Sequence, residues 1–100
     1  RYILYMAILS FSDSLTEKFF KTGKVVKAGW SNITSVASRK LDMIHYAVKL
    51  SDLKAPPNNK LEALKGNLTG YHSIRINDQW RVVFKWTDNG ATEVRITDYH

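Results

Sequence analysis

Residues 71–100, YHSIRINDQWRVVFKWTDNGATEVRITDYH, decide the fold, because apolar and polar side chains alternate along most of this stretch. A period of two is typical of strands that bury one face. Turn-forming residues interrupt the pattern at Asn77-Asp78 and at Asp88-Asn89-Gly90. Turns as short as these join antiparallel neighbours. The sequence therefore predicts an antiparallel sheet of three strands, at 71–76, 79–87 and 92–100.

The middle strand indicates which face of this sheet is buried. Arg81 and Lys85 lie opposite the apolar residues Trp80, Val82, Phe84 and Trp86. If helices cover the apolar face, the two cations line an open face, where a guanidinium can hold two phosphate oxygens. The alternative is an ordinary solvated face, on which Glu93 or Asp78 pairs with the cations.

Two helices are expected before the strands. Ser14-Leu15-Thr16-Glu17 fits a capping box, and Gly23 suits a helix end that requires a positive φ. A longer helix is predicted from Ser31 or Asn32 to about Leu50, because apolar residues recur there every three or four positions and leave Lys40 off the apolar stripe. Helices followed by an antiparallel sheet give an α+β fold, with the helices on one sheet face.

The length of 100 residues predicts a single domain, 1–100. The apolar run at residues 2–9 is too short to span a bilayer and is interpreted as an N-terminal strand, so no membrane association is expected. Because the chain begins with Arg1, one hypothesis takes Met6 as the native start. Residues 1–5 would then be non-native or an upstream leader.

The composition favours a polyanionic partner. Fifteen Lys and Arg against nine Asp and Glu give a formal net charge of +6, which raises affinity for nucleic acid, although many basic domains are merely soluble. The lack of cysteine excludes disulfides and zinc–thiolate sites and is compatible with a reducing cytoplasm. None of the three histidines stands four residues from another, so we expect no metal and no other cofactor.

The tail Asp98-Tyr99-His100 combines three consecutive side chains that can give or take protons. An unperturbed histidine titrates near ~6.5, which suits proton transfer at neutral pH. The alternative is a solvated, frayed terminus. On a regular strand Asp98 and His100 share the apolar face while Arg81 points the other way. These residues converge only if the last strand twists, bulges or frays at its end.

Other side chains of the three strands are candidates for binding a nucleic-acid substrate. Basic residues project from all three strands, and an aromatic ring such as that of Tyr71 can stack on a base. The candidate substrate-binding residues are Arg75, Lys85, Arg95 and Tyr71.

Three motifs make the chain resemble the HigB toxins, plasmid-maintenance killer proteins of the RelE/ParE superfamily. They are Leu64-Lys65-Gly66, the run from Arg75 to Arg81 (RINDQWR), and Asp98-Tyr99-His100. The resemblance extends forward to about Met6. It implies a compact RelE-like fold and a cytoplasmic, ribosome-dependent endoribonuclease that cuts mRNA in the ribosomal A site. The implied partners are the ribosome with its mRNA and a HigA-like helix-turn-helix antitoxin, through which alone operator DNA is bound.

The resemblance also implies the catalytic residues, which match Lys65, Arg81, Asp98, Tyr99 and His100. Some family members have His where this chain has Glu62, which leaves Glu62 and Asp98 as alternatives for the general base. RNA carries its own nucleophile, the 2′-hydroxyl, so the implied reaction needs no metal. The alternative function is a non-catalytic basic module of toxin-like fold that binds RNA or DNA.

Overall fold

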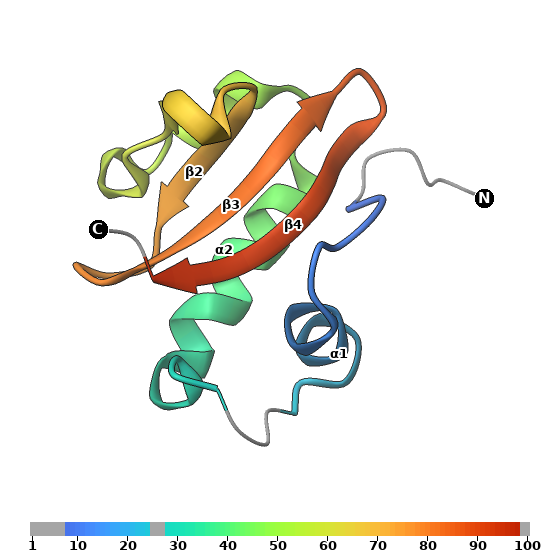
Figure 1. The fold of residues 1–100 in the computed structure, drawn as a ribbon, viewed down its shortest axis with the longest axis vertical. Helices are drawn as coiled ribbons and strands as arrows, with labels where there is room; N and C mark the ends of the chain where they lie inside the picture. Colours follow the sequence, from blue (N-terminus) through green and yellow to red (C-terminus); the bar gives the residue numbers. More distant parts are fainter. Residues whose placement is uncertain (1–7, 25–27, 99–100) are drawn as a thin grey trace.

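The computed structural model describes residues 8–24 and 28–98. Four strands form one antiparallel sheet in the order β1-β2-β3-β4: β1 (Glu62–Ala63), β2 (Tyr71–Arg75), β3 (Trp80–Thr87) and β4 (Gly90–Asp98). Two α-helices, α1 (Ser14–Thr22) and α2 (Thr34–Tyr46), precede it, and α2 passes behind β3 and β4 in Figure 1. The predicted α+β architecture and its three strands are confirmed, except that residues 99 and 100 of the last predicted strand lie outside the described residues. The sequence did not predict β1, because two residues show no period.

The helices and the apolar sheet face enclose one hydrophobic core. Phe19 of α1 and Leu41 and Ile44 of α2 are buried against residues from the three longer strands, among them Ile74, Val82, Phe84, Val94 and Ile96. This is the face that the alternation in β3 predicted. Trp30, which comes before the longer helix, is also buried, edge-on against Phe19. We call the other side of the sheet, which α2 does not cover, the open face.

A β-bulge at Glu93 interrupts β4. Val83 pairs with Arg95, whereas Lys85 pairs with Thr92, so the β3–β4 register shifts by one residue. Glu93 takes the left-handed conformation, with φ of 53°, which is the conformation that one type of bulge requires. The extra residue allows Ala91 and Val94, three positions apart, to be buried in the same core.

The helix boundaries differ from the prediction at two points. The N-cap of α1 is Asp13, whose carboxylate accepts a hydrogen bond from the Thr16 amide at 2.7 Å, so the predicted cap by Ser14 was wrong. Gly23 ends α1 as predicted, with φ of 75°. The longer helix begins with a 3-10 turn at Ser31–Ile33 and ends at Tyr46, four residues before the predicted end.

Lys40 lies inside the protein, although the apolar pattern placed it off the buried stripe. It is 6% exposed and donates a hydrogen bond to Oδ1 of the fully buried Asn59. Burial is the main cause that lowers the pKa of Lys40, and the charges of Arg39 and Arg75 add to the effect. Asn59 belongs to the segment between α2 and β1, which contains the 3-10 helices η2 (Leu50–Lys54) and η3 (Pro57–Asn59). The hydrogen bond between Lys40 and Asn59 therefore fixes this segment against α2.

Residues 8–12 run alongside β4. Ile8 and Phe11 form single parallel bridges with Ala91 and Val94. Part of the predicted N-terminal strand, residues 2–7, lies outside the described residues. The described part, residues 8–9, contributes one of these bridges instead of a regular strand. No helix in the described ranges is long and apolar enough to cross a membrane.

Candidate functional site

The sheet register places most of the predicted site residues on the open face. Arg75 lies opposite Arg81, and Tyr71 lies opposite Lys85, across β2 and β3. Between these two pairs lies a row of residues that crosses all four strands and consists of Glu62, Ser73, Val83 and Arg95. Neighbouring rows on one face of a sheet are about 7 Å apart, so long side chains from adjacent rows can meet.

Arg81 is held beside Glu62 on this face. Its Nη1 lies 3.3 Å from Oε1 of Glu62 and 3.3 Å from the Ser73 hydroxyl, to which it donates a hydrogen bond. The Arg81 side chain is only 15% exposed, whereas that of Glu62 is 45% exposed. The structure thus joins a fixed guanidinium to a solvent-accessible carboxylate. Ser73, which is fully buried, was not identified from the sequence, because a serine within a strand carries no distinctive signal.

A second cluster, which we call the Tyr71 cluster, consists of Tyr71, Lys85 and Glu93. The Tyr71 hydroxyl donates a hydrogen bond to Oε1 of Glu93 at 2.6 Å, and Lys85 Nζ lies 3.4 Å from Oε2 of Glu93. Lys85 Nζ also lies 4.9 Å from the centre of the Tyr71 ring. The ion pair between Lys85 and Glu93 is one that the sequence offered as an alternative to substrate binding.

The remaining predicted cations differ in their surroundings. Arg75 pairs with Asp78 at 2.6 Å, at the turn between β2 and β3. Arg95 lies in the middle row, and its side chain forms no hydrogen bond or ion pair within residues 8–24 and 28–98. Lys65 is exposed just after β1. Arg75 and Arg95 therefore lie in the same row as Arg81 and in the adjacent row, but the Arg75 side chain pairs with Asp78 at the end of the sheet.

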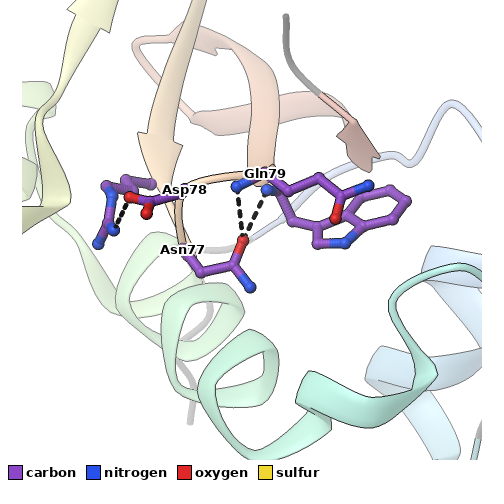
Figure 2. A network of polar contacts seen from close by, with 5 residues as sticks. Asn77, Asp78 and Gln79 are labelled. Atoms are coloured by element: carbon purple, nitrogen blue, oxygen red, sulfur yellow. Dashed lines mark hydrogen bonds and ion pairs between the residues drawn. The ribbon is translucent and has the colours of Figure 1, made fainter.

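The turn that holds Arg75 is built by side chains (Figure 2). The Asn77 side-chain oxygen accepts hydrogen bonds from the amides of Gln79, at 2.9 Å, and Trp80, at 2.8 Å. Asp78 and Gln79 then point in different directions, Asp78 toward Arg75 and Gln79 toward β4. The Gln79 side chain donates a hydrogen bond to Asp98 at 3.0 Å.

Asp98 ends β4 opposite Trp80 and not opposite Arg81. The bulge at Glu93 lies before this point, and pairing is regular from Arg95 to Asp98, so the bulge does not turn Asp98 onto the open face. The described part of β4 thus keeps Asp98 on the strand face that the regular alternation predicted. Tyr99 and His100, the other two residues of the predicted tail, lie outside the described residues.

A cavity of about 400 Å³ opens beside Glu62. His72 contributes to its wall, stacks against Phe84, and has a buried Nδ1 without a hydrogen-bond partner in the described part of the chain. Within that part, no group of three or more His, Asp and Glu side chains is arranged to hold a metal ion. The cavity is lined by Leu50, Ser51, Lys54, Leu61, Glu62, Ala63 and His72.

Known proteins are similar to this chain in both sequence and fold. A family model described as the RelE-like toxin of the type II toxin–antitoxin system HigB matches residues 9–100. Toxin HigB-1 of Vibrio cholerae is 41% identical over 83 residues, which make up 83% of this chain and 87% of that protein. The chain belongs to the HigB-like toxin family. It is therefore related to the toxins of type II toxin–antitoxin systems, as the three motifs indicated.

Solved structures confirm the RelE-like fold of this HigB-like chain. The YoeB–YefM complex of Staphylococcus aureus contains a chain with a TM-score of 0.58 and 26% identity, covering 97% of this chain and 99% of that one. The YoeB/ParE toxin of Agrobacterium tumefaciens has a TM-score of 0.54, with coverage of 95% and 100%, and at 22% identity it supports the fold alone.

The hydrogen bond within the Tyr71 cluster predicts a pH effect. It is the main cause that lowers the pKa of Glu93 below its ordinary value of 4.5, with Lys85 adding to the effect. A carboxylate of lowered pKa stabilises the fold above its unfolded pKa, and this contribution is lost as the pH falls through the folded pKa. Tyr71→Phe should therefore raise the pKa of Glu93 and make stability fall less steeply with acidification below pH 4.5.

An NMR titration of the Glu93 carboxylate in the wild type and in Tyr71→Phe checks this expectation. Urea unfolding of the two proteins at a series of acidic pH values measures the effect on stability. Asp52, which accepts hydrogen bonds from the backbone of Val48 and Lys49, provides the internal control. Its pKa is also lowered, but its causes do not include Tyr71. Equal shifts at Asp52 and Glu93 in the variant would contradict the assignment.

Proposed function

We propose that this HigB-like toxin is a ribosome-dependent endoribonuclease that cuts mRNA in the ribosomal A site and so inhibits translation. The observation that carries the proposal is the contact between the exposed Glu62 carboxylate and the Arg81 guanidinium, 3.3 Å apart on the open face. A base beside an anion-binding group is what attack of a ribose hydroxyl on the adjacent phosphate requires.

The reaction then proceeds in one displacement at phosphorus. Glu62 takes the proton of the 2′-hydroxyl, whose oxygen attacks the phosphate and breaks its bond to the 5′ oxygen of the next nucleotide. Arg81 and Lys65 stabilise the charge that grows on the phosphate oxygens. His100 gives a proton to the leaving oxygen, and Tyr99 orients a group or stacks on a base. The products are a 2′,3′-cyclic phosphate and a 5′-hydroxyl, and the RNA supplies the nucleophile without a metal ion.

Asp98 is the alternative base, and the register favours Glu62 over it. Glu62 shares the open face with Arg81, whereas Asp98 pairs opposite Trp80 and accepts a hydrogen bond from Gln79. In this proposal Asp98 orients neighbouring groups of the site.

The substrate-binding surface in this proposal is the rest of the open face. Arg75, Lys85 and Arg95 hold phosphates that flank the cleaved bond, and Tyr71 contacts a base. Binding of this kind depends on salt, because each phosphate contact releases counterions from the RNA.

We further propose a HigA-like helix-turn-helix antitoxin as the inhibitory partner, with operator DNA bound only through the complex. The S. aureus YoeB chain of similar fold was solved as a complex with YefM, which supports an antitoxin for this chain. A net charge of +6 would attract an acidic partner to the RNA-binding face. Since the proposed target is the translating ribosome, the proposed site of action is the cytoplasm.

Cell-free translation of a defined mRNA tests the proposed function. New 5′ ends are mapped by primer extension with wild type, Glu62→Gln, Asp98→Asn and His100→Ala. We expect cuts at codon boundaries that require ribosomes, and a loss of about 10²-fold or more in rate for Glu62→Gln, as for removal of a general base.

Three outcomes separate the alternatives. Cuts that survive Glu62→Gln but vanish in Asp98→Asn would make Asp98 the base. Cuts that persist in all three variants would support the nuclease activity but assign its catalysis to other residues. No cuts from folded, antitoxin-free wild type would favour a non-catalytic RNA- or DNA-binding module, whose cations are neutralised by partners such as Asp78 and Glu93.

A further inference from the structure

We propose that Glu93 is a positioning residue that fixes Tyr71 and Lys85 for contact with single-stranded RNA, and that Ser10 and Ser12 hold Glu93 in place. The inference rests on the proposed function, because it assumes that the open face binds RNA. It adds a role for Glu93, which touches no reacting group. It also adds a role for residues 8–12, which lie beside β4.

Both oxygens of the Glu93 carboxylate are used by the Tyr71 cluster. Oε1 accepts the hydrogen bond of the Tyr71 hydroxyl at 2.6 Å, and Oε2 lies 3.4 Å from Lys85 Nζ. Because Lys85 Nζ also lies over the Tyr71 ring, the three groups restrain one another. An ammonium held over an aromatic ring suits the phosphate of a nucleotide whose base contacts that ring.

The backbone of Glu93 is fixed from the opposite edge of β4. The Glu93 amide donates a hydrogen bond to the Ser10 hydroxyl at 2.9 Å, and the Ser12 hydroxyl donates one to the Glu93 carbonyl at 3.3 Å. Two backbone hydrogen bonds of the next residue, from the Val94 amide to the Ser10 carbonyl and from the Ser12 amide to the Val94 carbonyl, complete the contact. Two serines therefore satisfy the polar groups that a bulge leaves unpaired in the ladder.

The backbone conformation of Glu93 costs free energy, which favourable contacts of its side chain would offset. A φ of 53° is unusual for residues other than glycine, asparagine and aspartate. Its negative charge also repels RNA, so a surface selected only for polyanion binding would not keep it. The contacts with Tyr71 and Lys85 explain both the charge and the bulge that turns it onto the open face.

Two roles of Glu93, adding negative charge to the face and positioning Tyr71 and Lys85, predict opposite changes in the Kd for RNA when Glu93 is replaced. If Glu93 only adds negative charge to the face, Glu93→Ala tightens RNA binding. If Glu93 positions Tyr71 and Lys85, the same change weakens RNA binding, because both side chains become mobile and must be ordered again on binding.

The experiment measures the Kd of a fluorescent single-stranded RNA by anisotropy. Its 2′-O-methyl groups prevent cleavage. We expect Glu93→Ala to raise Kd about tenfold, comparable to the loss of one base–aromatic stack. The matched control is Glu17→Ala, which removes the same charge from an exposed ion pair with Lys21, 2.8 Å long, on α1. We expect its Kd to stay within about twofold, as for a solvated surface charge.

Further variants separate positioning from charge and from folding. Glu93→Gln keeps an oxygen that accepts the Tyr71 hydrogen bond, and should restore most of the affinity. Ser10→Ala should weaken binding in the same direction, and combined with Glu93→Ala it should add little, because both act through one contact. If Glu93→Ala does not fold, Glu93→Asn replaces it, since asparagine tolerates positive φ but is too short to repeat both contacts.

An unchanged or lower Kd in Glu93→Ala, or in Glu93→Asn if that is the folded variant, would overturn the inference, as would equal effects of Glu93→Ala and Glu17→Ala. The cleavage assay keeps this failure distinct from failure of the proposed function. In that assay Glu93→Ala should raise KM for mRNA with little change in kcat. Wild type that cuts mRNA, with Glu93→Ala indistinguishable from it, would refute the role of Glu93 alone. Wild type that never cuts would refute the nuclease, while the Kd series would still decide whether Glu93 positions an RNA-binding face.

Discussion

Replacing Arg81 with alanine should lower the rate of mRNA cleavage by about 10²–10³-fold, the usual cost of losing one oriented group that stabilises transition-state charge. The Arg81 guanidinium is already fixed before substrate arrives, by Glu62 and by the buried Ser73 hydroxyl. A pre-oriented charge needs no reorganisation as negative charge grows on the phosphate. The variant should still fold, since Arg81 lies on the open face and not in the core. Primer extension of mRNA from cell-free translation measures the rate, and circular dichroism checks the fold.

Two further variants make this expectation specific to Arg81. Arg39→Ala removes the same charge from the exposed surface of α2 and should cut mRNA at close to the wild-type rate. Arg81→Lys keeps the charge but loses the planar fork, so it should recover only part of the activity. Full activity in Arg81→Lys would mean that Arg81 acts as a point charge, and full activity in Arg81→Ala would remove it from the catalytic site.

The strands were predictable because their pattern is local. In β3 every second residue is apolar, and the turn residues on both sides occur where chain reversal needs them. This pattern was enough to place Arg81 and Lys85 together on a face free of α2. The resemblance to HigB toxins was carried by short motifs and is confirmed by the match over residues 9–100.

What the sequence did not predict depends on contacts between distant segments. The bulge at Glu93 is fixed by Ser10 and Ser12, more than eighty residues earlier in the chain. Its one local signal was the spacing of Ala91 and Val94, which a regular strand would place on opposite faces. Lys40 was expected in solvent because nothing nearby in the sequence indicates that Asn59 would cover it. The pairing of Glu62 with Arg81 required β1, a strand too short to be recognised from two residues.

Asn59→Ala should reduce the free energy of unfolding by about 3–5 kcal/mol, the range seen when a buried charged group loses its partner. The Asn59 side chain is fully buried and serves three polar groups at once. It accepts the hydrogen bond of Lys40 and donates hydrogen bonds to the carbonyls of Leu53 and Ala55, each at 3.2 Å. Alanine leaves all three groups without these bonds, and two of them, the Lys40 amine and the Leu53 carbonyl, are buried away from water. Each unpaired buried group costs about 1–3 kcal/mol.

Urea unfolding measures the change, and two variants test its cause. Asn58→Ala alters the exposed neighbour in the same 3-10 helix and should change stability by less than about 0.5 kcal/mol. Lys40→Met added to Asn59→Ala should recover part of the loss, because it removes the buried amine that the first change left unpaired. A double variant no more stable than Asn59→Ala would show that Lys40 is not the group that makes Asn59 necessary. Because Asn59 stands three residues before Glu62, the destabilised variant should also cut mRNA more slowly at temperatures well below its Tm. That result would connect the buried pair on α2 to the placement of the proposed base.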